Sequence, residues 1–210
     1  MTLSPESWQT WGSCAASDAL RTCGKAFQTM DGGIKPLAPQ LRLAGPAFTV
    51  RCYPGATWAM EQALEKARPG DVLVVDAGGR DDLIIMGGLM STRAEHRGIA
   101  GVVVDGAVRD VDDILALNFP VFTRHVCARG GTFAEIGELQ TTLCCGRVPV
   151  SPDDWIVADN SGVVVVPKTM LEEVAKEAES IHLKESRMAN ILTDGKSLAE
   201  AAEAAKQQTT

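Results

Sequence analysis

The sequence predicts an α/β domain with a mixed β-sheet flanked by helices and a C-terminal helical extension. Three observations support this fold class. Strand and helix patterns alternate in the first half, as in strand-helix-strand units with parallel strands. Short strands joined by turns that contain Asp, Asn and Gly follow, and they are typical of hairpins. Residues 168–206 are mostly helical in pattern, with a break at Asp194 and Gly195.

The predicted elements follow one another at short intervals. Residues 4–33 contain one or two short helices, and Gly24 is suited to end one of them. A strand at 43–53 precedes an amphipathic helix at 58–67 and a buried strand at 71–76. Farther along we expect helices at 87–97 and 111–117, and strands at 101–105, 120–124, 142–150, 155–158 and 163–166; residues 130–139 form a loop.

Length and composition narrow the class of protein. The 210 residues suit one domain at 1–167 and a helical extension at 168–210. A net charge of −7 disfavours nucleic acid and anionic membranes as partners. The six cysteines lack CxxC spacing and no signal peptide is recognisable, which predicts reduced thiols in a cytoplasmic protein. The apolar runs are far shorter than the roughly 20 residues that span a bilayer.

The most informative segment is residues 98–113. Three valines at 102–104 lie between glycines and predict a buried strand that ends in a sharp turn at Asp105 and Gly106. Arg109 and Asp110 then leave the sheet together, at the edge where open α/β sheets bind ligands. An ordinary alternative is a pair of solvated charges at a helix start.

A second feature points to the same edge. Gly87 and Gly88 precede a run of helix formers, so the backbone amides of Leu89 and Met90 would be free at a helix N-terminus and could bind an anion. The glycines could also form a simple tight turn. An anion-binding helix end and an Arg-Asp pair on one strand-helix-strand unit together favour a functional site.

Other candidate residues are weaker. Near the same edge, several carboxylates are expected to be mainly turn residues, although one could hold a water bound to Mg²⁺: Asp76, Asp81, Asp82 and Asp105. The three histidines lack metal-binding spacing. Cys144 and Cys145 are interpreted as core packing rather than as a nucleophile.

The stretch from Gly87 to Ile114 resembles the signature of the RraA-like family, and it contains the pattern G-x4-T-x-A-x3-G-x2-G-x-V-x-D-G-x2-R-D. This family contains divalent-metal pyruvate aldolases, which act on 4-hydroxy-4-methyl-2-oxoglutarate and 4-carboxy-4-hydroxy-2-oxoadipate, and the regulator of ribonuclease E activity A. The similarity covers about residues 17–167. Other matching segments are 17–20, 45–50, 70–76, 120–122 and 162–167.

The resemblance implies a partly closed sheet of the swivelling β/β/α type and assigns roles by position. Asp110 corresponds to the ligand of Mg²⁺ or Mn²⁺, and Arg109 to the residue that holds the pyruvoyl group. The segment Gly87, Gly88, Leu89 and Met90 corresponds to the substrate-binding helix start, whose amides hold the carboxylate. Family enzymes also borrow a carboxylate from a neighbouring subunit's C-terminal helix, for which we choose Glu185. A homotrimer or a hexamer of two trimers is implied likewise.

One position departs from the aldolase pattern. Aldolases of the family usually carry Asp or Glu where this chain has Gly88. The change removes a candidate acid or base, so either another carboxylate such as Asp81 or Asp105 replaces it, or the chain catalyses an easier reaction. Decarboxylation of oxaloacetate is easier in this sense, because no proton has to be taken from a 4-hydroxyl group.

The sequence therefore predicts a metal-dependent carbon-carbon lyase for a small 2-oxo acid. It would cleave 4-hydroxy-2-oxo diacids to pyruvate, decarboxylate oxaloacetate, or do both, through a metal-stabilised enolate. The presence of Asp110 favours an enzyme, since regulator-type members typically lack this residue. The alternative is a non-catalytic regulator that binds ribonuclease E or another protein, and a related lyase or hydrolase for another small acid is a third interpretation.

Overall fold

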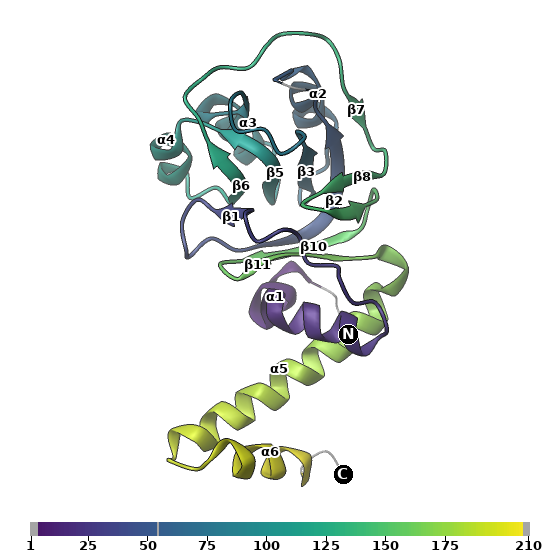
Figure 1. Ribbon diagram of the computed structural model, residues 1–210, viewed down its shortest axis with the longest axis vertical. Coiled ribbons are helices and arrows are strands. Elements are labelled where there is room, and N and C mark those ends of the chain that lie inside the picture. Colours follow the sequence, from purple (N-terminus) through teal and green to yellow (C-terminus); the bar gives the residue numbers. More distant parts are fainter. Residues whose placement is uncertain (1–3, 54, 208–210) are drawn as a thin grey trace.

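The computed structural model describes residues 4–53 and 55–207, and it confirms the predicted fold class. A mixed sheet, flanked by helices, forms the body of the molecule, and a helical arm extends from it (Figure 1). Residues 1–3, 54 and 208–210 lie outside the described residues. The first and last of these ranges are the outer ends of the predicted domain at 1–167 and of the predicted extension at 168–210.

Four parallel strands form the centre of the sheet and end at one common edge. In spatial order they are β6 (Val121–Val126), β5 (Gly101–Val108), β3 (Val72–Asp76) and β2 (Leu43–Arg51). Three helices contribute side chains to the core on one face of these strands: α2 (Trp58–Lys66), α3 (Gly88–His96) and α4 (Val111–Ala116). Burial on both faces explains why these strands are continuous runs of apolar residues rather than alternating ones.

Antiparallel strands extend and partly close the sheet. β10 (Trp155–Asp159) pairs with β2 and with β11 (Gly162–Val166), and β1 (Lys35–Pro36) pairs with β6. The expected strand at 142–150 is instead a hairpin of β8 (Leu143–Cys145) and β9 (Val148–Val150), because Gly146 and Arg147 have positive φ values and turn the chain. The expected loop at 130–139 ends in a two-residue strand, β7 (Glu138–Leu139), which pairs with β2.

Helices at the two ends of the chain pack against each other. α1 (Pro5–Thr22) covers β10 and β11 together with the first part of α5 (Leu171–Thr193), which follows the short η1 (Lys168–Met170). The rest of α5 and α6 (Leu198–Gln207) extend away from the sheet (Figure 1). Among the described residues, no helix combines the length and the apolar character needed to cross a membrane.

The prediction of a sharp turn at Asp105 and Gly106 is wrong. β5 continues through both residues to Val108, with a shift in its pairing to β6 between Val104 and Ala107. A Cβ atom on Gly106 would lie 2.7 Å from the Cβ of Ala77, so glycine is needed there for close approach of two segments rather than for a turn. The longer strand carries Arg109 farther toward the sheet edge than the sequence indicates.

A short strand that the sequence did not predict also shapes this edge. β4 (Ile84–Met86) pairs with the end of β5 and leads directly into α3. The backbone N–H of Arg109 donates a hydrogen bond to the carbonyl oxygen of Met86 at 3.1 Å. β4 therefore fixes Gly87 beside Arg109.

Candidate active site

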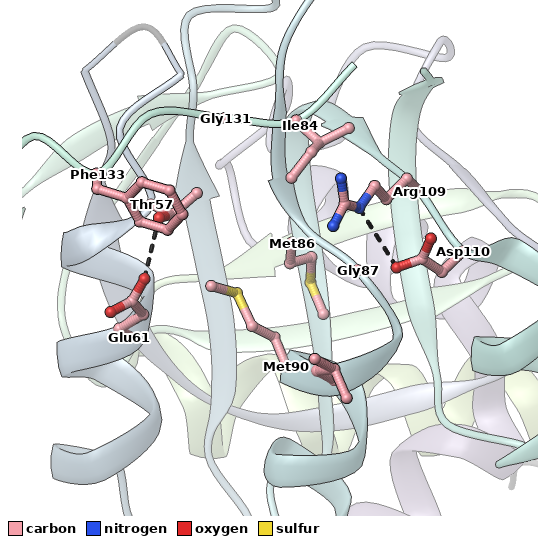
Figure 2. Close-up of a pocket in the computed structure, with 12 residues that line it drawn as sticks. Thr57, Glu61, Ile84, Met86, Gly87, Met90, Arg109, Asp110, Gly131 and Phe133 are labelled. Carbon is pink, nitrogen blue, oxygen red and sulfur yellow. Dashed lines mark hydrogen bonds and ion pairs between the residues drawn. The ribbon is translucent and has the colours of Figure 1, made fainter. Parts of the chain in front are cut away.

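A cavity of about 320 Å³ lies at the sheet edge where β4 and β5 end. Its walls are the first turns of α2 and α3, the ends of these two strands, and the loop at 130–133. Figure 2 shows Arg109 and Asp110 on one side of the cavity and Thr57 and Glu61 on the other. The structure thus brings Arg109, Asp110, Gly87, Leu89 and Met90 to one cavity.

Asp110 is held by backbone geometry and by two polar contacts. It precedes α4 with a left-handed backbone (φ 56°, ψ 45°), a conformation that aspartate tolerates better than most residues. Its Oδ2 atom accepts a hydrogen bond from the Gly88 N–H at 3.0 Å and lies 3.4 Å from Nε of Arg109. The side chains of Arg109 and Asp110 remain 44% and 38% exposed, so a ligand in the cavity can reach both.

The start of α3 presents two free backbone amides. Gly87 is the N-cap residue and Gly88 begins the helix. The Gly88 N–H is taken by Asp110, but within the described part of the chain the N–H groups of Leu89 and Met90 have no hydrogen-bond partner. Unpaired amides at a helix N-terminus attract anions, and a carboxylate is a suitable one.

The opposite wall carries a second carboxylate. Oε1 of Glu61 accepts a hydrogen bond from Oγ1 of Thr57 at 3.0 Å, which fixes the side chain against the first turn of α2. Among the described residues, no Lys, Arg or His side chain forms an ion pair with Glu61. Glu61 therefore keeps a carboxylate available to a ligand across the cavity from Asp110.

The loop at 130–133 forms one wall of the cavity. Thr132 exchanges backbone hydrogen bonds with two neighbours, donating to Gly55 and accepting from Thr57. A Cβ atom on Gly131 would lie 2.6 Å from the carbonyl oxygens of both Gly55 and Ile84, so glycine permits this close contact. The same loop places Phe133 at the cavity with 88% of its surface exposed.

The two carboxylates that the sequence offers as possible replacements for the missing acid at Gly88 do not line this cavity. Asp105 is buried, where Oδ1 pairs with Nε of Arg124 at 2.5 Å and Oδ2 accepts from the Gly146 N–H at 2.7 Å. This hydrogen bond to Asp105 raises the pKa of Arg124. Asp81 lies in the loop between β3 and β4 and does not line the cavity. Asp105 is therefore a structural ion-pair residue.

The remaining predicted carboxylates also have structural partners. Asp82 forms an ion pair with Arg80, and Asp76 lies 3.6 Å from Arg51. Cys145 is buried, and this burial raises the pKa of its thiol well above the ordinary value, which agrees with a packing role. Cys144 is exposed, so the prediction of core packing is wrong for that residue.

Position 88 is crowded by α4. A Cβ atom on Gly88 would lie 3.1 Å from Cβ and 3.2 Å from Oδ2 of Asp113. A side chain at position 88 would therefore require Asp113 to shift by a few tenths of an ångström.

Glu185 lies on the exposed part of α5, which extends away from the sheet (Figure 1). It does not line the cavity of its own chain. A contact with a neighbouring subunit's cavity stays a prediction.

The residues at the cavity fit a hard divalent cation held partly by substrate. Mg²⁺ is commonly bound by one or two carboxylates together with substrate oxygens and water. Both contacts of Asp110 use Oδ2, and Oδ1 takes part in neither. Within residues 4–53 and 55–207, no three His, Cys, Asp or Glu side chains gather around one point. A cation at Asp110 would therefore complete its coordination with a chelating ligand and water.

Sequence reasoning missed Thr57, Glu61 and Phe133. The amphipathic pattern identifies the helix at 58–67 and its buried face, but it does not show which polar residue faces a ligand. Phe133 lies in a loop without periodicity. These residues could be found only by knowing that the loop at 130–133 contacts the start of α2, and the sequence alone does not show this contact.

Comparison with known proteins identifies relatives over most of the chain. The family model described as RraA-like, Aldolase/RraA, matches residues 13–165. A protein of Halalkalibacterium halodurans, named "Putative 4-hydroxy-4-methyl-2-oxoglutarate aldolase", is 40% identical over 163 residues, which cover 78% of this chain and 76% of the relative.

Solved structures share the fold. The crystal structure of an uncharacterized protein from Pseudomonas syringae pv. tomato aligns with a TM-score of 0.82 and 28% identity, over 96% of this chain and 99% of that chain. The RNA-processing inhibitor RraA from Thermus thermophilis aligns with a TM-score of 0.66 and 27% identity, over 72% and 92% of the two chains.

Proposed function

Because the chain belongs to the RraA-like family, we propose that it is a divalent-metal-dependent lyase that forms pyruvate from a small 2-oxo acid. The observation that carries this proposal is the convergence of Arg109, Asp110 and two free amides on one cavity. The test is pyruvate formation from oxaloacetate and from 4-hydroxy-2-oxo acids, measured with and without Mn²⁺.

The chain's own groups suit the binding of a 2-oxo acid. The free N–H groups of Leu89 and Met90 bind the substrate carboxylate, and the guanidinium of Arg109 stabilises the negative charge that develops on the 2-oxo oxygen. Asp110 would hold the Mg²⁺ or Mn²⁺. When bound, the cation supplies Lewis-acid polarisation of the 2-oxo group.

Decarboxylation of oxaloacetate requires the fewest catalytic groups from the site. Its C3–C4 bond breaks, C4 leaves as CO₂, and the bonding electrons remain on C3 as the enolate of pyruvate, which then takes a proton at C3. Arg109 stabilises this enolate by its positive charge. No proton has to leave a hydroxyl group, so the absence of an acid at Gly88 does not prevent this reaction.

Cleavage of a 4-hydroxy-2-oxo acid needs one more group. Glu61 takes the proton of the C4 hydroxyl, C4 becomes a carbonyl as the C3–C4 bond breaks, and the electron pair again enters the pyruvate enolate. Glu61 suits this role because it is the lining carboxylate across the cavity from Asp110 and has no cation partner among the described residues. It takes the place that the sequence assigned to Asp81 or Asp105.

Replacing Glu61 by glutamine should separate the two reactions. We expect Glu61→Gln to lower kcat for cleavage of 4-hydroxy-2-oxo acids by about a hundredfold, the usual lower bound for loss of general base catalysis. Oxaloacetate decarboxylation should persist, since it needs no base. Steady-state assays of pyruvate release measure both.

The matched control is Glu95→Gln, which removes the same charge from α3 outside the cavity lining and should leave both rates unchanged. Equal losses of both activities in Glu61→Gln would instead indicate a structural role, and unchanged cleavage would rule out Glu61 as the base.

The second candidate function is that of a binding protein. It is supported by the likeness to the Thermus RNA-processing inhibitor RraA. In that case ribonuclease E or another protein would bind the surface, and no 2-oxo acid would be turned over. We also propose a trimer or hexamer, in which α5 brings Glu185 to a neighbouring subunit.

A further inference from the structure

We infer that the cavity selects a 4-hydroxy-2-oxo acid whose C4 substituent is apolar over the corresponding dicarboxylic acid. This inference rests on the proposed function and adds the class of substrate. It concerns the second substituent at C4 of the substrate, to which no residue has been assigned.

The wall that faces this part of the substrate is apolar. Ile84 and Met86, the first and last residues of β4, are buried, and Met90 and Phe133 complete the surface between the Arg109 side and the α2 side (Figure 2). Apolar side chains favour a methyl or similar group at C4, because its burial removes apolar surface from water.

Charge at the cavity acts in the same direction. Arg109 is the only cationic side chain among the described residues that line it, and it is already engaged by Asp110 and by the developing enolate. A second substrate carboxylate would lose its water without gaining a cation, which is costly. It would also face the negative charge of Glu61.

Two arginines on neighbouring elements have other partners, and Arg129, next to the lining residue Gly130, does not itself line the cavity. Arg93 on α3 donates hydrogen bonds to the carboxylate of Glu65 from Nε at 2.9 Å and from Nη2 at 2.7 Å. Arg51 at the end of β2 pairs with Glu138 at 3.0 Å. Neither lines the cavity. The site therefore differs from one built to bind a dicarboxylate such as the 4-hydroxy-4-methyl-2-oxoglutarate in the name of the Halalkalibacterium relative.

A matched pair of substrates tests this inference on the intact protein. 4-Hydroxy-2-oxopentanoate carries a methyl group at C4, and 4-hydroxy-2-oxoglutarate carries a carboxylate there. Cleavage of either gives pyruvate, together with acetaldehyde or glyoxylate. We expect kcat/KM to be at least about tenfold higher for the methyl compound, a typical discrimination for one mismatched group in a pocket.

A cation introduced at the apolar wall should change this preference. Phe133→Arg should lower the methyl-to-carboxylate ratio of kcat/KM by about tenfold. Phe27→Arg is the matched control, because Phe27 is 96% exposed and lies outside the cavity lining. The methyl-to-carboxylate ratio of kcat/KM in this control should equal that of the wild type.

The outcomes separate this inference from the proposed function. Equal or better cleavage of the dicarboxylate by the wild type would overturn the inference while leaving the lyase intact. If Phe133→Arg and Phe27→Arg had the same methyl-to-carboxylate ratio of kcat/KM, the apolar wall would not determine the selectivity. No turnover of either compound or of oxaloacetate would overturn the proposed function and the inference with it.

Discussion

Asp110→Asn is expected to lower pyruvate formation from every 2-oxo acid substrate by at least about a thousandfold in kcat, which corresponds to about 4 kcal/mol of transition-state stabilisation. Asparagine keeps the shape of the side chain, can still accept the Gly88 N–H, and tolerates the left-handed backbone at this position. What it removes is the negative charge that would hold the cation. Initial rates at saturating Mn²⁺ measure the loss.

The control for this variant is Asp112→Asn on the first turn of α4. Asp112 is exposed and does not line the cavity, so the control should retain wild-type rates. If the Asp110→Asn variant kept more than a tenth of the wild-type rate, the proposed role of the Asp110 carboxylate in holding the cation would be wrong. Thermal melting of both variants shows whether a lost rate reflects lost folding.

Gly87→Ala is expected to be the second most damaging change, with a loss of about a hundredfold in kcat/KM. A Cβ atom at this position would collide with Oδ2 of Asp110 and would lie 3.0 Å from Cγ of Arg109. The backbone itself accepts alanine, since φ is −150°. The substitution therefore displaces Arg109 and Asp110 without straining the chain, and displacement of catalytic groups by a fraction of an ångström is costly.

Gly32→Ala serves as the control, because a Cβ atom there meets nothing within 4 Å. Its kcat/KM should match that of the wild type. Full activity in Gly87→Ala would mean that Arg109 and Asp110 are not packed against Gly87 as described.

The convergence of Gly87 and Arg109 could be predicted because the helix start at Gly87 and the buried strand that precedes Arg109 belong to one strand-helix-strand unit. The strand β4 could not, because three residues carry too little periodicity to be recognised. Asp105 is a candidate from the sequence because it lies near the same sheet edge, and its ion-pair partner Arg124 lies on another strand, β6. The pairing depends on the parallel register of two strands, which one sequence does not give.

The far wall of the cavity shows the same limit. Glu61 was within a correctly predicted helix, but its exposure to a ligand depends on the loop at 130–133, which folds back onto the start of α2. Such a contact between a loop and a helix leaves no pattern in either segment. The roles assigned to Arg109, Asp110 and Glu185 by resemblance stay predictions until they are tested.

The most direct test of the central claim is pyruvate release from oxaloacetate by the wild-type protein after treatment with EDTA and removal of the chelator. A divalent cation bound beside Asp110 predicts that the rate above the protein-free background is lost, and that Mn²⁺ or Mg²⁺ restores it in the wild type but not in Asp110→Asn. Enzymatic pyruvate release that continues undiminished after the metal has been removed would contradict the claim.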